Sequence, residues 1–422
     1  MFERPRGGER AILVLVELAP PERLGDAVEF IELAVSAGVT AAATITVRRG
    51  RPDPKYFVGL GKVEELKAAV LAHDAEVVLF DRSLSPAQER NLERALSCRV
   101  LDRNGVILDI FAQRARSFEG KLQVEMAQLT HLSTRLVRGW THLERQRGGI
   151  GLRGPGETQL ETDRRLIGKR IKQLGERLEK VRRQRAQGAR ARRRAALSTA
   201  ALVGYTNAGK STLFNLLTTS QTYAADKLFA TLDTTLRRMN VPGEHPVLVS
   251  DTVGFIRDLP PELIAAFQAT LDETKDASLL LHVIDASADD VAARRTEVQS
   301  VLARIGASET PLIEVYNKID RTSAPESRTV PGTNGEPTRV WVSACSGAGL
   351  DELKHAVSEH LAQTKTRRQI ALPAHAGRLR AQLYEFGAVL EEEVLADGSW
   401  RLEVTISDPR WAQLLEATEH LR

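Results

Sequence analysis

Runs of Val, Ile and Leu alternate with amphipathic stretches from residue 11 to about residue 102. The runs are short and nearly continuous, whereas the apolar residues between them recur at helical spacing. The runs cover residues 11–18, 39–47, 76–80 and 99–102, and the helical segments cover residues 26–38, 62–74 and 86–97. Alternation of strand and helix favours a small parallel sheet. We therefore predict an N-terminal α/β domain over residues 1–110.

The segment "VGLGKVEEL", residues 58–66, lies inside this domain and has a faint likeness to a phosphate-binding loop. It lacks the full GxxxxGK[ST] spacing. We interpret it as a plain loop that caps a helix, with a phosphate-binding loop as the alternative. The pattern leaves open whether this domain also binds ATP.

The next part of the chain contains two long helical patterns. Their apolar positions are Leu122, Met126, Leu129 and Leu136 in the first, and Ile167, Ile171, Leu174, Leu178 and Val181 in the second. The second series is typical of a short coiled-coil seam. The two patterns flank a Gly-rich segment, residues 139–161, which predicts an antiparallel hairpin with this segment at its tip.

A basic stretch at residues 180–194 ends the second helical pattern. We interpret it as a linker that contacts nucleic acid, with a solvated charged face as the alternative. The hairpin and this linker are expected to span residues 111–196.

Strand and helix alternate again over residues 197–364, which predicts a second α/β domain. The tail at residues 365–422 contains a helical pattern around residues 377–395 and a strand pattern at residues 400–407. We expect the tail to form a small α/β C-terminal domain. The fold class predicted for the whole chain is therefore α/β.

The composition limits what this chain can be. Apolar residues make up 42% and charged residues 27% of the 422 residues, which is the balance of a globular protein. The apolar run at residues 11–20 contains Glu17 and is too short to span a bilayer, so we expect no membrane anchor and a cytoplasmic setting. Cys98 and Cys345 show no CxxC spacing, so neither a disulfide framework nor a zinc site is predicted.

Candidate chemistry begins with "GYTNAGKS", residues 204–211, which follows an apolar strand pattern and opens a helical one. This is the context of a phosphate-binding loop, in which glycines let the backbone amides surround phosphates. Lys210 is expected to reach the terminal phosphates, and the Ser211 hydroxyl is expected to bind Mg²⁺.

Three further motifs follow strand patterns downstream of this loop. Asp251 in "DTVGF" can hold Mg²⁺ through water, and Gly254 can offer its amide to the terminal phosphate. Asp320 in "NKID" can accept both the ring N–H and the exocyclic amine of guanine, a pair of donors that adenine lacks. Ser343 and Ala344 in "VSACS" fit the loop that packs against the base. Together with the phosphate loop, these motifs predict a GTPase.

Between the first two motifs lies "LFATLDTTLRR", residues 228–238. We expect Thr231 to supply a second Mg²⁺-binding hydroxyl and to sense the γ-phosphate, with Thr234 and Thr235 as alternatives. Phe255 stands where many GTPases have a Gln that orients the attacking water, and a phenyl ring cannot hydrogen-bond that water. Intrinsic hydrolysis is therefore expected to be slow.

The predicted site combines these motifs. Lys210, Thr231 and Gly254 are expected to act in catalysis, and Ser211 and Thr231 to bind Mg²⁺. The residues expected to bind GTP or GDP are Gly204, Tyr205, Thr206, Asn207, Ala208, Gly209, Lys210, Ser211, Thr212, Phe229, Ala230, Thr231, Leu232, Asp233, Asp251, Thr252, Val253, Gly254, Asn317, Lys318, Ile319, Asp320, Ser343, Ala344 and Cys345.

The same motifs carry a resemblance to a known family. The chain resembles the HflX family of ribosome-associated GTPases in "GGIGLRGPGETQLETDRR" at residues 148–165, and in "GYTNAGKSTLFN", "FATLDTT" and "DTVGFI". The resemblance covers almost the whole chain, and the Gly-rich segment is its most specific part. One departure is Thr234, where the family commonly has Pro, so the hydroxyl assignment in this segment stays open.

The resemblance implies a partner and an activity. The partner is the large ribosomal subunit, with the N-terminal part approaching ribosomal RNA near the peptidyl transferase centre. The activity is GTP-dependent separation of stalled or idle ribosomes into subunits. The missing catalytic element is either brought by another segment or assembled by the partner, for which the ribosome is the candidate, and we expect the protein to be a monomer. One alternative is an RNA-binding GTPase in ribosome assembly or RNA modification. Another is a binding module in which GTP only stabilises the fold.

Overall fold

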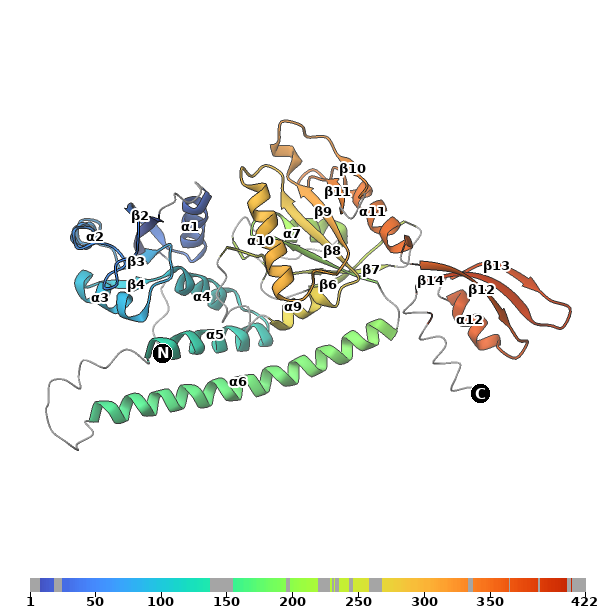
Figure 1. The fold of residues 1–422 in the computed structure, drawn as a ribbon, viewed down its shortest axis with the longest axis horizontal. Coiled ribbons are helices and arrows are strands. Elements are labelled where there is room, and N and C mark those ends of the chain that lie inside the picture. The colour runs from blue at the N-terminus through green and yellow to red at the C-terminus, as the bar shows by residue number, and fades with distance from the viewer. Residues whose placement is uncertain are drawn as a thin grey trace.

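The structure is a computed structural model of the 422-residue chain. It describes residues 8–18, 25–136, 155–194, 198–218, 228–229, 231, 235–242, 246–257, 268–332, 337–363, 365–385, 388–407 and 411. An N-terminal domain, a central domain and a small C-terminal module lie in a row, and one long helix runs beneath the first two (Figure 1).

The N-terminal domain is built on a parallel four-stranded sheet with the order β2-β1-β3-β4. Its strands are β1 (Arg10–Leu18), β2 (Thr40–Arg49), β3 (Val77–Phe80) and β4 (Arg99–Leu101). Successive residues of a strand point to opposite faces, so Leu13 and Val14 enter different apolar clusters. Both faces of β1 and β3 are buried, which explains their nearly continuous apolar runs, whereas the edge strand β2 leaves several residues exposed. The predicted parallel sheet is confirmed.

Two helices cover each face of this sheet. Phe30 and Phe111 pack in the cluster of Leu13, whereas Leu66 and Leu92 pack in the cluster of Val14. The first pair of helices is α1 (Gly25–Ser36) and α4 (Arg103–Arg114), and the second pair is α2 (Leu60–His73) and α3 (Pro86–Leu96). Gly59 is the N-cap residue of α2, so residues 58–59 precede the helix as interpreted, but the interpretation of the whole segment 58–66 as a loop is wrong because residues 60–66 form the first turns of α2.

Helices α5 (Phe118–Leu136) and α6 (Pro155–Arg194) form the predicted antiparallel hairpin. Leu122 packs with Leu174 and Leu178 at the seam. Two ion pairs beside the seam show that the helices are antiparallel. Glu119, near the start of α5, pairs with Arg185, near the end of α6, at 2.9 Å, and Glu125, further along α5, pairs with the earlier Arg170 of α6 at 2.6 Å. Most of the Gly-rich tip predicted at residues 139–161 lies outside the described residues.

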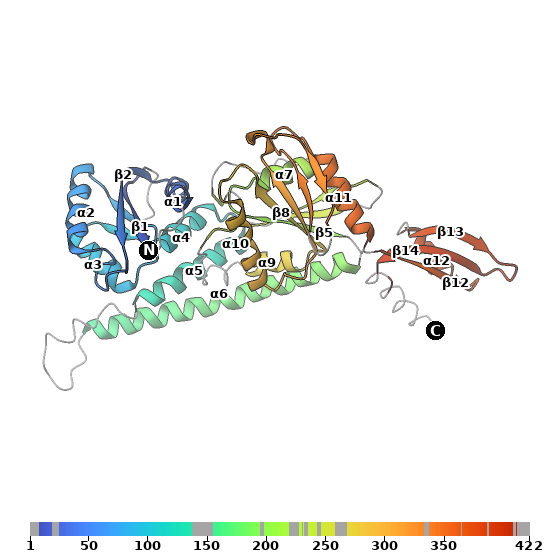
Figure 2. The same ribbon diagram turned by 45° about the horizontal axis from the view of Figure 1, so that its top comes forward.

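Helix α6 has 40 residues and is therefore about 60 Å long. Figures 1 and 2 both show it running beneath α5 and then beneath the central domain. Arg185 contributes to this second contact, because its guanidinium lies 3.5 Å from the carboxylate of Glu273 in α9 (Gln268–Lys275). Neither α6 nor any other described helix is apolar enough to cross a membrane.

The central domain contains a seven-stranded sheet with the order β10-β11-β9-β8-β5-β7-β6, and only the pair at each edge is antiparallel. Its strands are β5 (Thr199–Gly204), β6 (Thr235–Met239), β7 (Val247–Asp251), β8 (Leu279–Asp285), β9 (Leu312–Asn317), β10 (Arg328–Val330) and β11 (Thr338–Trp341). The parallel strands end at a shared edge, which is where open α/β sheets bind ligands.

Helices also cover both faces of the central sheet. Phe214 and Val357 pack with Leu202 of β5 on one face, whereas Leu271 and Val301 pack with Val203 on the other. The first face carries α7 (Lys210–Thr218) and α11 (Leu350–Gln363), and the second carries α9 and α10 (Val291–Arg304). The chain is thus of the predicted α/β class.

The C-terminal module is a three-stranded antiparallel sheet in which α12 (Gly377–Glu385) packs Leu383 against Leu402. Its strands, in sheet order, are β12 (Lys365–Leu372), β14 (Trp400–Ser407) and β13 (Val389–Val394). The helix predicted at residues 377–395 is wrong in its second half, because residues 389–394 form β13. Three glutamates in this strand favour a helix locally, but the strand pairs with β14, where Arg401 lies 2.8 Å from Glu393. Tertiary pairing overrides propensity here.

Candidate functional site

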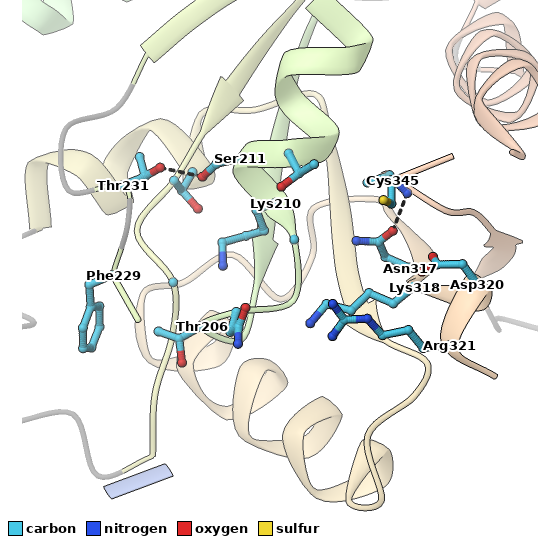
Figure 3. Close-up of a pocket in the computed structure, with 16 residues that line it drawn as sticks. Thr206, Lys210, Ser211, Phe229, Thr231, Asn317, Lys318, Asp320, Arg321 and Cys345 are labelled. Carbon is cyan, nitrogen blue, oxygen red and sulfur yellow. Dashed lines mark hydrogen bonds between the residues drawn. The ribbon is translucent and has the colours of Figure 1, made fainter. Parts of the chain in front are cut away.

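A cavity of about 290 Å³ opens at the carboxyl edge of the central sheet (Figure 3). Its wall consists of Thr206, Asn207, Gly209, Lys210, Ser211, Thr212, Phe229, Thr231, Thr252, Gly254, Asn317, Lys318, Asp320, Arg321, Ala344 and Cys345. All of these except Arg321 belong to the set predicted from the sequence. The only sequence signal for Arg321 is its place directly after Asp320, in the turn Ile319–Arg321 (η2).

The other predicted residues divide into two groups. One group is buried and does not line the cavity: Gly204, Tyr205, Ala208, Asp251, Val253, Ile319 and Ser343. The second group, Ala230, Leu232 and Asp233, lies outside the described residues, as does the alternative Thr234.

The loop at residues 204–211 connects β5 to α7, and its backbone requires glycine at two points. Gly204 has a φ of 151°, and a Cβ there would lie 2.2 Å from the Val283 carbonyl oxygen. Gly209 has a φ of 91°, and a Cβ there would lie 2.3 Å from the side-chain nitrogen of Asn317. Because no side chain fits at either point, only glycines let the loop pack this closely at the N-terminus of α7.

Lys210 is the first residue of α7 and is buried within this loop. Its ammonium group donates to the carbonyl oxygens of Gly204 at 3.0 Å and Tyr205 at 2.7 Å. Burial lowers the pKa of Lys210 to about 8, and the nearby Asp251 carboxylate opposes this shift. The loop thus holds a cationic group where an anionic ligand would need one.

Three oxygen-bearing side chains meet beside Lys210. Ser211 Oγ lies 2.6 Å from Thr231 Oγ1 (Figure 3), and both hydroxyls donate to Asp251 Oδ2 at 2.7 Å. Asp251 Oδ1 is buried and has no hydrogen-bond partner within the described part of the chain. Burial also raises the pKa of Asp251. Hydroxyl and carboxylate oxygens suit Mg²⁺, and a cation near Asp251 would offset the burial of its charge.

The opposite end of the cavity is organised by Asn317, the last residue of β9. Its side-chain N–H donates to the Ala208 carbonyl at 2.8 Å, and its side-chain oxygen accepts the Ala344 amide at 2.9 Å. Asp320 accepts the Ser343 hydroxyl at 2.5 Å and also lines the cavity. Asn317, at the end of β9, therefore connects the loop at residues 204–211 with the loop that contains Ala344.

Phe255 lies outside the cavity wall. It is only 3% exposed and packs in an apolar cluster that includes residues of the N-terminal domain. Its amide donates to the Gly204 carbonyl at 3.0 Å, and its carbonyl accepts the Thr206 amide at 2.7 Å. The side chain thus contributes packing and no group that could orient water.

A parallel sheet with this loop after its first strand, and an Asn-Lys-x-Asp turn after a later one, defines a P-loop hydrolase that recognises guanine nucleotides. The chain is 54% identical over 414 residues to GTPase HflX of Escherichia coli (strain K12), which covers 98% of this chain and 97% of that relative. It is 45% identical over 401 residues to GTPase HflX of Magnetococcus marinus, covering 93% and 91% of the two chains. The chain belongs to the HflX family of GTPases.

Family models match four successive parts of the chain. They are described as GTP-binding GTPase N-terminal (residues 26–112), GTP-binding GTPase Middle Region (114–193), 50S ribosome-binding GTPase (199–318) and HflX C-terminal domain (331–417). A crystal structure of a GTP-binding protein from Sulfolobus solfataricus in complex with GDP is 22% identical, with a TM-score of 0.44, over 84% of this chain and 99% of that chain. As a member of its family, the protein binds GTP and GDP and hydrolyses GTP.

Proposed function

We propose that this GTPase binds the large ribosomal subunit and, in its GTP state, separates stalled or idle ribosomes into subunits, while the ribosome stimulates hydrolysis. The observation that carries this proposal is an incomplete catalytic site. Phe255 is buried outside the cavity, and the described residues that line the cavity include no Gln or His. We infer that a group that orients water is brought by another segment of the chain or by the partner. The match of residues 199–318 to a family described as 50S ribosome-binding GTPase supports the large subunit as its source.

The proposed role of the oxygen cluster is to hold Mg²⁺, which would neutralise charge on the β- and γ-phosphates. Ser211 and Thr231 would supply hydroxyl ligands, and Asp251 would act through water. The convergence of these oxygens within 2.7 Å and the unpaired Asp251 Oδ1 support this assignment. Thr235 is the less suitable alternative, because it begins β6 and pairs with Asp251 in the sheet.

Lys210 and Gly254 would stabilise the charge that develops on the phosphates. The Lys210 ammonium would exchange its two carbonyl partners for phosphate oxygens, and the Gly254 amide would donate to the γ-phosphate. Gly254 is suited to this position because a Cβ there would lie 2.9 Å from Thr206 Cγ2 and 3.0 Å from Lys210 Nζ. The amide can therefore approach a ligand that a larger residue would keep away.

Asp320 would select guanine by accepting its ring N–H and its amine. A purine that lacked these donors would leave Asp320 with only its hydrogen bond from Ser343, and the loss of the two bonds to the base discriminates between ligands. Arg321 lines the same cavity and would add positive charge near the nucleotide.

The face of α6 opposite the hairpin seam supports contact with ribosomal RNA. Helical periodicity places several exposed basic residues on this face together with Glu176, and Glu179 at its border forms an ion pair with Arg183 at 3.5 Å. The basic residues are Arg165, Lys169, Lys172, Lys180 and Arg183. Lysine and arginine on one face can follow a phosphate backbone, and such contacts weaken as salt rises. The N-terminal part of the protein is proposed to approach the RNA near the peptidyl transferase centre.

Cosedimentation with ribosomes tests the proposal. The protein with a non-hydrolysable GTP analogue should sediment with large subunits and convert intact ribosomes into subunits, whereas the GDP form should do neither. Added ribosomes should also accelerate GTP hydrolysis. Lys210→Ala is the control, because it should remove the nucleotide dependence.

Two other outcomes would contradict the proposal. Binding only to immature large subunits would favour a role in ribosome assembly. Hydrolysis unaffected by ribosomes would favour a binding module in which GTP stabilises the fold.

The remaining parts of the proposal concern the organisation of the chain. The protein would act as a cytoplasmic monomer, with functional units at residues 1–110, 111–196, 197–364 and 365–422. Analytical ultracentrifugation and limited proteolysis test the monomer and the boundaries.

A further inference from the structure

Two helices of the N-terminal domain lie against the nucleotide site. Phe111 of α4 packs on Phe229, with ring centroids 4.6 Å apart. The Leu228 amide donates to Ser36 Oγ of α1 at 3.2 Å, and the Arg114 guanidinium of α4 donates to the Leu228 carbonyl. The segment that carries Thr231 is therefore anchored to the N-terminal domain three residues earlier.

The second contact involves the phosphate-binding loop itself. Tyr205 follows Gly204, is only 6% exposed, and donates its hydroxyl proton to the carboxylate of Glu29 in α1. The same hydroxyl accepts the backbone N–H of Arg257 at 3.0 Å. Burial and the nearby Glu29 raise the pKa of Tyr205, so the phenol keeps the proton that it donates.

Arg103 of α4 completes the arrangement. Its buried guanidinium forms an ion pair with Glu29 and donates to the backbone carbonyl of Arg257 at 3.3 Å. The N–H and the C=O of Arg257 are thus both held, one by the phosphate-binding loop and the other by the N-terminal domain. We call Glu29, Arg103, Tyr205 and the backbone of Arg257 the Tyr205 network.

Arg257 is three residues after Gly254, whose amide is the proposed donor to the γ-phosphate. Between them, Phe255 is fixed to Gly204 and Thr206 by two backbone hydrogen bonds of 3.0 and 2.7 Å. Gly254 itself packs so closely on Thr206 that a Cβ would not fit. Residues 254–256 therefore have little freedom to adjust, so a shift of the Arg257 backbone also displaces the Gly254 amide.

We propose that Glu29, Arg103 and Tyr205 are positioning residues for GTP hydrolysis: through the backbone of Arg257 they fix where the Gly254 amide meets the γ-phosphate. The hydrolysis step thereby depends on side chains of the N-terminal domain that do not touch the nucleotide. Separate contacts of α1 and α4 with Leu228 and Phe229 connect the same domain to the segment of Thr231.

The test uses the full-length protein without ribosomes, so it stands apart from the proposed ribosomal function. Tyr205→Phe keeps the ring and removes both hydrogen bonds of the hydroxyl. Single-turnover GTP hydrolysis should slow about tenfold, which corresponds to about 1.4 kcal/mol of transition-state stabilisation. The GDP dissociation constant, measured with a fluorescent nucleotide, should stay within about twofold because the loop backbone is unchanged.

Tyr384→Phe is the matched control. The Tyr384 hydroxyl also donates to a glutamate, Glu392, at 2.6 Å, but it lies in the C-terminal module. This variant should hydrolyse GTP at the parental rate. A parental rate in Tyr205→Phe as well would overturn the proposal, and so would a loss of affinity as large as the loss of rate.

Glu29 provides a second and independent comparison. Glu29→Ala should slow hydrolysis, whereas Glu29→Gln should recover most of the rate because its amide oxygen can still accept from Tyr205. The double variant Glu29→Ala with Tyr205→Phe should be no slower than the slower single variant, since both changes interrupt one chain of contacts. Additive losses, or no recovery with Gln, would show that these side chains act only through general stability.

Discussion

Replacing Asn317 by Asp changes one side-chain group from an amide nitrogen to an oxygen, and it should weaken nucleotide binding. The wild-type side chain is 1% exposed, donates to the Ala208 carbonyl at 2.8 Å and accepts the Ala344 amide at 2.9 Å. Aspartate has nearly the same shape and keeps the acceptor. It replaces the donor by an oxygen that faces the Ala208 carbonyl, so one buried hydrogen bond becomes a repulsive contact.

The size of the effect follows from the burial of this group. A buried polar group left unpaired costs about 1–3 kcal/mol, and more when it is charged. If moving the phosphate-binding loop relieves about 2–3 kcal/mol of this cost, GDP affinity falls by roughly 30- to 150-fold, because each 1.4 kcal/mol is a factor of ten. Titration with a fluorescent GDP derivative at pH 7.5 measures this loss.

The loss should depend on pH in a defined direction. Burial raises the pKa of the new carboxyl, and its protonated form can donate to Ala208 as the amide does. The defect is therefore present above that pKa and disappears as the pH falls below it, so the affinity ratio between wild type and variant should narrow between pH 8 and pH 5.5.

Two controls make this prediction specific. Asn317→Ala should lose affinity without recovery at low pH, because it has no group to protonate. Asn91→Asp removes a similar donor, which bonds the Lys55 carbonyl at 3.0 Å in an exposed part of the N-terminal domain, and should bind GDP normally. Wild-type affinity of Asn317→Asp at pH 7.5 would refute the argument that Asn317 holds the loops together.

Three further predictions concern base recognition, hydrolysis and stability. Asp320→Asn should weaken GTP binding and improve binding of xanthosine triphosphate, measured by competition; unchanged GTP affinity would contradict the assignment. Phe255→Gln should not raise the ribosome-free rate of hydrolysis, because position 255 is buried outside the cavity, and a large gain would be inconsistent with this placement. Burial lowers the pKa of His282 to about 3, from an unfolded value near 6.5, so its neutral form contributes stability that is lost as the pH falls below about 6.5. The free energy of unfolding should therefore fall by about 2 kcal/mol between pH 7 and pH 5. Urea unfolding of His282→Gln at pH 7 and pH 5 should no longer show this difference. An unaltered pH dependence in the variant would argue against a buried neutral imidazole.

Much of this protein could be predicted from short stretches of sequence. The spacing of Gly204, Gly209, Lys210 and Ser211 indicates a phosphate-binding loop because all these residues act within one turn between a strand and a helix. The apolar periodicity of residues 11–18 and of α6 indicates their elements because burial repeats with the geometry of a strand or a helix. In each case the interacting groups are close in sequence, so the spacing of residues is enough to predict the local structure.

Other features arise from contacts between distant parts of the chain. The Glu-rich segment at residues 389–394 has a helical composition and becomes a strand only because β14 lies beside it. Arg321 lines the cavity as the last residue of η2, the turn that follows β9. For β13 the decisive partner is supplied by the fold, and for Arg321 the sequence offers only its place after Asp320.

The sequence by itself predicted most of the residues that line the nucleotide cavity, and the tertiary structure decided what holds them in place. Asn317 and Ala208 are 109 positions apart and are joined by a buried hydrogen bond. Tyr205 and Glu29 are 176 positions apart and are joined by a partly buried one. Such contacts depend on how whole domains pack, because an apolar cluster shared by the N-terminal and central domains brings α1 and α4 to the nucleotide loop. Periodicity can place Glu29 on a helix, but only that packing places its carboxylate against the Tyr205 hydroxyl.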